Sequence, residues 1–313
     1  MCIRDRIEGN KDIIAGITDL TTEADAAESQ KDSYGKLQFF SDFSIAPSYL
    51  IQGTIDNSIP AWMNEDGTLN ENAVKEYLEQ VNRIWQTQKN AIEETKKAYQ
   101  MGDDWADSDH SGYMDISGSV TSLLAKVDTV AAGGLLSPEG LVSLDSARKV
   151  DPDLDYKLLN GQSENCFYPR SAVGVSAKAS EKEAAEKFVK FLFEEESQRA
   201  SNTEGLAVNS KVYEDMAYWK MGKSSGDTIG SIGASYDTGD GNIKQIEMDE
   251  IIPEDEAIQN IMDLGKTLTV PAKSNQIIRN AVTESGEKYL NGETGLDDAV
   301  KEIMQEVNLY LSE

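Results

Sequence analysis

The residues of this chain that could carry acid–base or metal chemistry are almost all carboxylates. The 313-residue sequence contains 56 Asp and Glu residues but a single histidine, His110, and two cysteines, Cys2 and Cys166. One imidazole removes most zinc sites and histidine-based triads. Two distant cysteines form neither a disulfide framework nor a metal-binding spacing. A catalytic hypothesis must therefore rest on a pair of carboxylates, and we expect no catalytic residue and no cofactor.

An acidic loop, "GDDWADSDHSGYMD", has partial calcium-binding spacing. Five of its residues match positions 1, 3, 5, 6 and 9 of an EF-hand loop: Asp107, Asp109, Ser111, Gly112 and Asp115. Position 12, which should supply a bidentate Glu, is Gly118. The pattern favours a solvated loop at the rim of a cleft, with calcium as the weaker alternative and no metal as the main expectation.

Two aromatic residues in that loop, Trp105 and Tyr113, are candidate ligand contacts. An aromatic ring in a polar loop can anchor the loop on apolar surface or offer a stacking face to a flat ligand such as a sugar. Both alternatives remain open for these two residues.

The charge balance excludes one class of partner. A formal net charge of −27 leaves no basic stripe to neutralise phosphates, so we expect no nucleic acid. No apolar run is long enough to span a bilayer and no secretion signal is visible. The first six residues, "MCIRDR", carry two arginines in an otherwise acidic chain and read as a non-native start. A lipid-modified Cys2 is the alternative.

Periodic apolar residues and local sequence signals predict the positions of several helices and strands. Apolar residues recur at three and four after a capping box formed by Thr68 and Glu71, which predicts a helix of about 25 to 30 residues ending before Gly102. From residue 116 the chain alternates in the α/β manner, with Ser137 and Pro138 opening a helix and strands expected at 153–161 and 171–177. Residues 37–51 are expected to be irregular and extended.

A second capping box, Ser180 and Glu183, precedes the most strongly patterned helix. Its apolar stripe is expected to be buried and consists of Ala184, Ala185, Phe188, Phe191 and Leu192. Residues 222–250 are rich in Gly, Ser and Asp and are expected to be a long, poorly ordered surface excursion. Two closing helices are predicted, at about 274–290 and 295–312.

The stretch from "VGVSAKASEKEAAEKFVKFLF" to "EGLAVNSKVYED" resembles the family 1 extracellular solute-binding proteins of ABC importers, the maltose-binding-like group. The pattern is a strand, a capped helix with A-x-x-F-V-x-F-L, a glutamine and a G-x-x-V-N segment. The matching residues are Ala185, Phe188, Val189, Phe191, Leu192, Gln198, Gly205, Val208 and Asn209. "SLLAKVDTVAAGGLLSPEGL" and the closing "EKYLNGETGLDDAVKEIMQEVNLYLSE" are similar to further family segments, so the resemblance covers residues 60–313.

The resemblance implies an α/β fold of the type II periplasmic-binding kind, in which two lobes close on a ligand. The C-terminal lobe would be largely complete and the N-terminal lobe mostly missing. On this basis residues 1–66 are a remnant of the N-terminal lobe and crossover, with 1–6 non-native. Residues 67–250 are the C-terminal α/β lobe, and 251–313 are closing helices that pack across the lobes.

The resemblance also implies which residues face the cleft, in three short segments. These are Gly133, Gly134 and Leu135, then Phe167, Tyr168 and Arg170, then Ser274, Asn275 and Gln276. Each has an ordinary alternative: close packing for the glycines, a strand edge for the aromatics, an ion pair for Arg170, and a helix cap for Ser274 and Asn275. Pro169 biases Tyr168 toward an extended backbone.

The implied function is capture of a small-molecule solute, an oligosaccharide, by a monomer that delivers it to the transmembrane subunits of an ABC permease. The implied location is extracellular, with a lipoprotein anchor in the full-length protein. Two other classes stay open: a carboxylate-dependent glycoside hydrolase, and a surface sensor or adhesin that uses the same fold without transport. Peptides and polyamines remain possible ligands.

Overall fold

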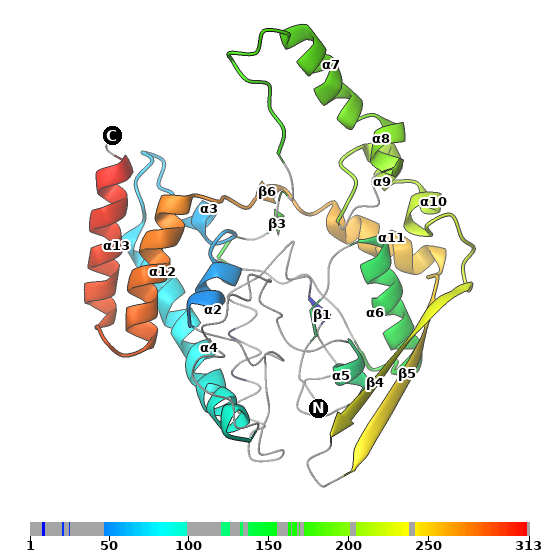
Figure 1. Cartoon of the computed structure of the whole chain (residues 1–313), viewed down its shortest axis with the longest axis horizontal. Coiled ribbons are helices and arrows are strands. Elements are labelled where there is room, and N and C mark those ends of the chain that lie inside the picture. The colour runs from blue at the N-terminus through cyan, green and yellow to red at the C-terminus, as the bar shows by residue number, and fades with distance from the viewer. Residues whose placement is uncertain are drawn as a thin grey trace.

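The computed structural model describes residues 8–9, 21, 25, 47–98, 120–125, 132–133, 137–154, 162–163, 165–167, 169, 172–200, 205–237 and 242–311. The described part is a mixed α and β structure. Its three strand pairs are all two-stranded: β1 with β2, β3 with β6, and β4 with β5. In Figure 1 the short β3 and β6 lie between helices α3 and α12 on one side and helices α6 and α11 on the other.

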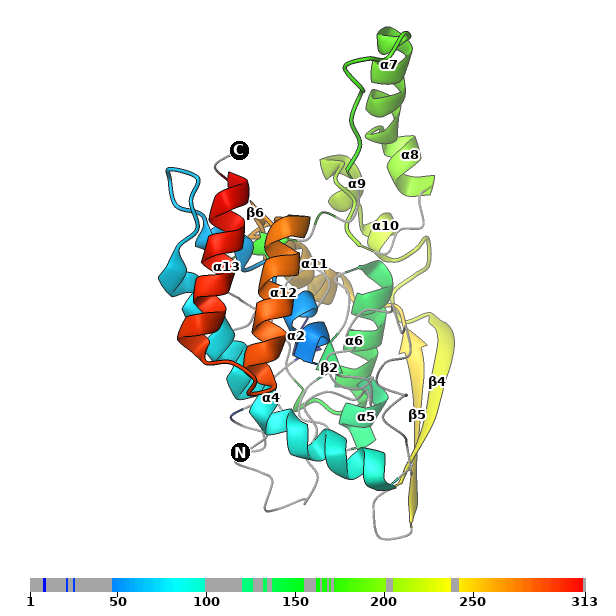
Figure 2. The same ribbon diagram turned by 60° about the vertical axis from the view of Figure 1, so that its left-hand side comes forward.

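One side of the molecule is a block of packed helices, which we call the helical block. It consists of α2 (Pro47–Thr54), α3 (Ile59–Trp62), α4 (Glu71–Ala98), α12 (Gln276–Leu290) and α13 (Leu296–Leu311). Figure 2 shows α12 and α13 side by side in front of α4. The apolar positions of α4 that the periodicity singles out from Val74 to Trp85 are buried in one core with residues of α2, α12 and α13. Trp62 packs edge-on against Tyr77, with 5.0 Å between ring centroids.

The helix α12 contains a glycine where three helices come close together. A Cβ on Gly286 would lie 2.8 Å from Ile51 Cδ1 of α2 and 3.1 Å from Leu78 Cδ2 of α4. The missing side chain therefore lets α12 approach both neighbours closely.

The other side carries a β-hairpin that packs on two helices, and we call it the hairpin block. Strands β4 (Thr228–Asp237) and β5 (Ile243–Ile251) are antiparallel, with Ile232 opposite Met248 and Ala234 opposite Ile246. Ile232, Ile246 and Met248 pack with residues of α5 (Val120–Ala125) and α6 (Pro138–Val150) in a second, smaller core. Helix α11 (Asp255–Gly265) follows the hairpin.

A third group of short helices leads away from the hairpin block. Helix α7 (Lys182–Leu192) projects from the rest of the molecule in both views, followed by α8 (Glu195–Ala200), α9 (Ser210–Tyr213) and α10 (Met216–Trp219). No residue of α7 is buried.

Several predictions from the sequence are confirmed. The helices at α4, α12 and α13 are present at the expected positions. Helix α6 begins as expected, since the Ser137 hydroxyl accepts a hydrogen bond from Gly140 N at 3.0 Å and Pro138 occupies the first turn.

Other predictions are wrong. Residues 222–250 form most of the β4–β5 hairpin, because Ile232, Ile246 and Met248 bury one face of a Gly-rich ribbon. Residues 47–51 are helical, because Leu50 and Ile51 belong to the core of the helical block. Asn70, rather than Thr68, caps α4 by accepting from Ala73 N, since the Thr68 hydroxyl donates to Asp66.

The predictions of a second capping box and of a buried apolar stripe at α7 are also wrong. Helix α7 has Glu181 at its N-cap with no side-chain cap hydrogen bond. Within its apolar stripe Ala184, Phe188 and Phe191 are exposed and Ala185 and Leu192 are half-buried.

Candidate functional site

The site begins at the parallel pairing of β3 (Cys166–Phe167) with β6 (Val270–Pro271). Asn165 precedes β3 with a positive φ of 52°, a conformation that Asn tolerates better than most residues. Its carbonyl oxygen accepts from Thr269 N at 2.9 Å and Val270 N at 3.0 Å. The backbone at Asn165 therefore fixes β3 to the segment entering β6.

The pairing continues into the N-terminus of α12. Ala272 N donates to Phe167 O at 2.7 Å, and Lys273 N donates to Asp56 O at 2.9 Å. The side chain of Asn275 then caps α12 by accepting from Ile277 N and Ile278 N. One short segment thus joins β3, the end of α2 and the start of α12.

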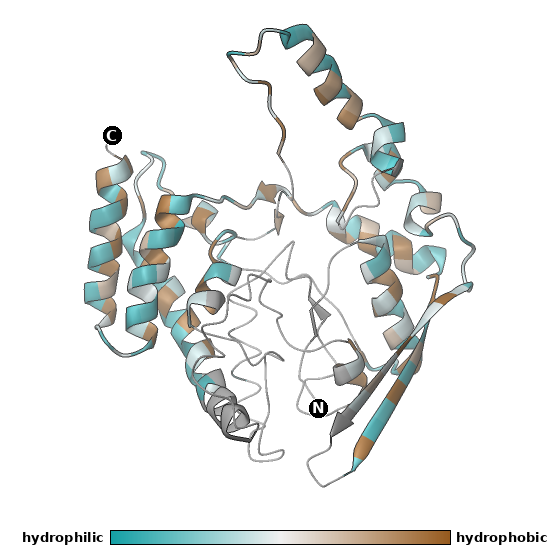
Figure 3. Ribbon diagram, in the orientation of Figure 1, coloured by the Kyte–Doolittle hydropathy of each residue, from teal (hydrophilic) through white to brown (hydrophobic). Residues whose placement is uncertain are grey.

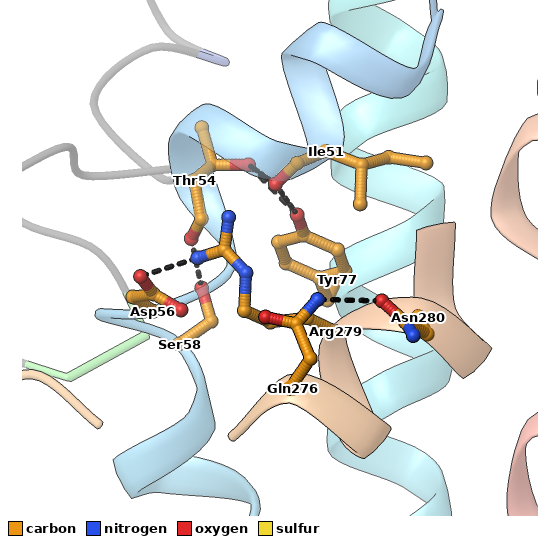
Figure 4. Close-up of polar contacts among 8 residues, drawn as sticks. All are labelled: Ile51, Thr54, Asp56, Ser58, Tyr77, Gln276, Arg279 and Asn280. Atoms are coloured by element: carbon orange, nitrogen blue, oxygen red, sulfur yellow. Dashed lines mark hydrogen bonds and ion pairs between the residues drawn. The ribbon is translucent and has the colours of Figure 1, made fainter. Parts of the chain in front are cut away.

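A buried ion pair lies at the centre of this junction, as Figure 4 shows. The Arg279 guanidinium of α12 donates to the Asp56 carboxylate just beyond α2, and the two side chains are 21% and 7% exposed. Burial strengthens the attraction but makes either charge costly without its partner. The pair ties α12 to the chain after α2.

Tyr77 of α4 stabilises the C-terminal end of α2, next to this ion pair. Its hydroxyl donates to Ile51 O at 3.0 Å and shares a 2.8 Å hydrogen bond with Thr54 Oγ1. Ser58 Oγ donates to Thr54 O at 2.9 Å. Burial raises the pKa of Tyr77 well above its ordinary value, so its hydroxyl is protonated at neutral pH and serves as a hydrogen-bonding group.

The loop before β3 is anchored on the helical block by Gln162. Its side chain accepts from Trp62 Nε1 at 2.6 Å and donates to Ala73 O at 3.0 Å. Strand β3, which carries Phe167, is therefore connected to the helical block through Gln162 and to β6 through the backbone pairing.

The structure brings together four of the predicted site residues. Phe167 is half-buried at the β3–β6 pair, and Ser274, Asn275 and Gln276 lie three to five residues after the end of β6. Ser274 and Gln276 are exposed, and the Gln276 amide donates to Asn280 Oδ1 at 2.7 Å. Asn275 has the helix-cap role that was its ordinary alternative.

Gly133 is a predicted site residue that belongs to a different strand pair. Gly133 lies in β2 (Ala132–Gly133) and pairs in parallel with Gly9 of β1 (Glu8–Gly9), so a strand is its close neighbour. The others lie outside the described residues: Gly134, Leu135, Trp105, Tyr113, Tyr168, Arg170 and the calcium set Asp107, Asp109, Ser111 and Asp115. Within the described ranges no three His, Cys, Asp or Glu residues are grouped to hold a metal ion.

Asp56 and Arg279 are the residues of this junction that the sequence reading missed. They are 223 positions apart, so no local spacing relates them. The hydrogen bonds at this junction join its own elements to one another, and the ring of Phe167 is half-buried beside them.

The segment containing Gln198 and the G-x-x-V-N motif has a clear physical role next to α7. Gln198 donates to Leu192 O at 2.8 Å and accepts from Val208 N at 3.0 Å. Asn209 donates to Phe193 O at 2.8 Å and caps α9 through Lys211 N and Val212 N. These two side chains hold the end of α7 against the segment entering α9.

Comparison with known families identifies the class of protein. The family model for bacterial extracellular solute-binding proteins matches residues 9–199, and the chain belongs to this family. Its members serve as extracellular binding components of transporters and are generally not enzymes. No curated protein matches the chain. No helix in the described part of the chain is long and apolar enough to cross a membrane.

Proposed function

We propose that this chain is the substrate-binding component of an ABC importer of the maltose-binding-like group. It captures a neutral solute, an oligosaccharide, and delivers it as a monomer to the transmembrane subunits of a permease. The full-length protein is an extracellular lipoprotein with two lobes of the type II arrangement.

The observation that carries this proposal is the β3–β6 pair. It sets Phe167 beside the segment Ala272–Gln276, and both lie where the helical block meets the hairpin block. We propose that this short pair acts as a hinge, because few residues would need to change conformation on closure. Closure around a ligand is favoured by the ligand's higher affinity for the closed state.

A sugar fits the exposed residues of the junction. Arg279 is already paired with Asp56, and Tyr77 is fully buried, so we do not expect either to contact the ligand. Sugars present hydroxyls to exposed polar groups such as Ser274 and Gln276, and apolar C–H faces to aromatic rings. Phe167 and the neighbouring Tyr168 and Arg170 are the proposed contacts, with Ser274 and Gln276 as polar neighbours.

Thermal-shift measurements with maltooligosaccharides, a peptide mixture and spermidine test the proposal on the full-length protein. Binding to the native state raises the melting temperature by mass action, and we expect a rise only with the oligosaccharides. Tyr168→Ala and Arg170→Ala should weaken that rise while leaving the melting temperature without ligand unchanged.

Three results would contradict the proposal. If no sugar raises the melting temperature, the ligand is not an oligosaccharide. If Tyr168→Ala and Arg170→Ala lower the melting temperature without ligand as much as they lower the ligand-induced rise, residues 165–170 have a structural role. Turnover of labelled oligosaccharide makes the protein a glycoside hydrolase.

A further inference from the structure

The two edges of the β4–β5 hairpin differ in the described part of the chain. On the β5 side, the Ser146 hydroxyl of α6 accepts a hydrogen bond from Ile251 N at 2.9 Å and donates to Ile251 O at 3.5 Å. Figure 2 shows β5 between α6 and β4. On the β4 side, the described residues provide no backbone hydrogen bond to residues 228–235 beyond the ladder with β5. The free edge of the hairpin is therefore that of β4.

Alternation along the strands determines which backbone groups face this free edge. The N–H and C=O groups of Ile251 point away from β4, toward Ser146. In an antiparallel pair this direction reverses at each residue, and residues directly opposite each other share it. The register then directs the backbone groups of Ser231, Gly233 and Ser235 toward the free edge. These groups are available to the backbone of an added strand.

Strand β4 lacks the features that usually prevent strand addition at an exposed edge. Charged side chains, especially lysine, and proline are the common ones. Residues 228–235, "TIGSIGAS", contain neither, although 27% of the residues in the chain are charged. The ladder is irregular between Thr228 and Gly230 and regular beyond. The edge from Gly230 onward is therefore open to another strand.

The outer face of the hairpin indicates which charge that strand would carry. Apolar positions of β5 pack toward α5 and α6, and polar positions alternate with them, as Figure 3 shows. The exposed Glu247 and Asp249 lie opposite Gly233 and Ser231. Neither carboxylate forms an ion pair with another residue in the described ranges. Two negative charges thus lie on the solvent face, one strand in from the free edge.

The small residues of β4 leave these carboxylates within reach of an added strand. Two strand spacings, roughly 10 Å, separate such a strand from β5. Gly233 places no side chain in between, and a Cβ there would lie 3.9 Å from Ile246 O. A long cationic side chain on the added strand can extend over Gly233 or Ser231 toward Glu247 or Asp249.

We propose that the free edge of β4 binds an extended polypeptide segment with lysine or arginine at alternate positions. The segment adds to the hairpin as a third strand, with its backbone paired to Ser231, Gly233 and Ser235 and its cationic side chains beside Glu247 and Asp249. A second copy of this chain fits less well, because each copy carries a net charge of −27 and its β4 offers no cation. The surface is separate from the β3–β6 junction, so its occupancy does not depend on the solute.

Isothermal titration calorimetry with three synthetic ten-residue peptides tests the proposal on the 313-residue protein. An alternating Lys-Thr peptide supplies both charge and backbone donors. An alternating Gln-Thr peptide lacks the charge, and an N-methylated Lys-Thr peptide keeps the charge but has no backbone N–H groups. We expect the Lys-Thr peptide to bind at least about tenfold more tightly than either of the others at low salt.

Variants of the protein separate the strand edge from the carboxylates. Ser235→Pro removes an outward N–H donor but no bond of the ladder with β5, and Glu247→Gln/Asp249→Asn removes the two charges. Each should weaken binding of the Lys-Thr peptide by about fivefold or more. The matched control, Glu284→Gln/Glu306→Gln, makes the same change of charge at exposed positions of α12 and α13 and should leave the affinity unchanged.

Residue-resolved amide exchange locates the peptide on the hairpin. In the free protein, Ser231, Gly233 and Ser235 should have lower protection factors than Ile232 and Ala234, whose amides the ladder protects. The Lys-Thr peptide should raise the protection of the three outward amides at least about tenfold.

High protection of the outward amides in the free protein would overturn the proposal, because the edge would already be occupied. Equal binding of the N-methylated peptide would overturn it as well, as would unchanged affinity in Glu247→Gln/Asp249→Asn or no measurable binding of the Lys-Thr peptide. A dimer of the free chain that sedimentation detects and Ser235→Pro abolishes would assign the edge to a second copy.

Discussion

At the scale of single residues, the junction depends on one buried charge pair rather than on any catalytic group. Asp56 and Arg279 come from elements far apart in the sequence, and each is largely removed from water. Surface ion pairs contribute little because water screens both charges. A buried pair behaves differently, since removal of one partner leaves the other as an uncompensated charge.

We expect Asp56→Ala to lower the free energy of unfolding by about 3 kcal/mol, because it leaves Arg279 without its counter-charge. The double variant Asp56→Ala/Arg279→Met should recover most of this loss. Urea denaturation followed by circular dichroism measures both. Removal of the exposed Glu183–Lys187 pair on α7 by Glu183→Ala is the control and should have no measurable effect. A double variant as unstable as Asp56→Ala would show that the loss comes from packing.

At the scale of elements, close contacts between helices determine where α9 and α11 lie. The Tyr213 hydroxyl of α9 donates to Met262 O of α11 at 2.7 Å. Gly265 ends α11 beside the same hydroxyl, and a Cβ there would lie 2.3 Å from Tyr213 Oη. The two helices can keep this hydrogen bond only while residue 265 has no side chain.

We expect Gly265→Ala to destabilise the protein by about 1–2 kcal/mol, because the new methyl group displaces the Tyr213 hydroxyl from its acceptor. Tyr213→Phe removes the clashing oxygen, so the double variant should be more stable than the sum of the two single changes predicts. Chemical denaturation of all four proteins gives this coupling energy. Additive effects would mean that Tyr213 moves aside without cost.

At the scale of the whole molecule, buried weak acids in different parts of the fold link its stability to alkaline pH. Burial raises the pKa of Tyr77 above its ordinary value of 10.0, that of Tyr213 to about 12 and that of Cys166 to about 11. Asp263 and Glu214 add to the effect at Tyr213. In each case the folded state holds a proton that the unfolded chain releases more easily.

Stability should therefore be greatest below the unfolded pKa values and should fall as pH rises above about 9, since the unfolded state then loses protons first. The net charge of −27 becomes still more negative over this range, which adds repulsion. Urea midpoints between about pH 7 and 11, with tyrosinate absorbance recorded in parallel, test the expectation. Tyr77→Phe should lessen the decline. Ionisation of all the tyrosines at their ordinary pKa in a fully folded protein would contradict it.

Local patterns in the sequence were sufficient for the long helices and for the family. The spacing of Val74, Tyr77, Leu78 and Val81 places one face of α4 in the core, and the closing helices follow the same logic. The Gln198 and Asn209 motif was recognisable because its hydrogen bonds join residues close in the chain. Such features follow from short-range periodicity and local bonding.

Tertiary structure alone decided the rest, because contact between distant residues leaves no trace in local spacing. It paired Asp56 with Arg279 and placed Phe167 beside Pro271. It also turned the Gly-rich stretch after residue 222 into a hairpin, since burial of Ile232 and Met248 outweighs weak strand propensity. The stripe of α7 shows the same division: the sequence determines that the helix is amphipathic, but only the arrangement of neighbouring elements determines whether its apolar face is covered.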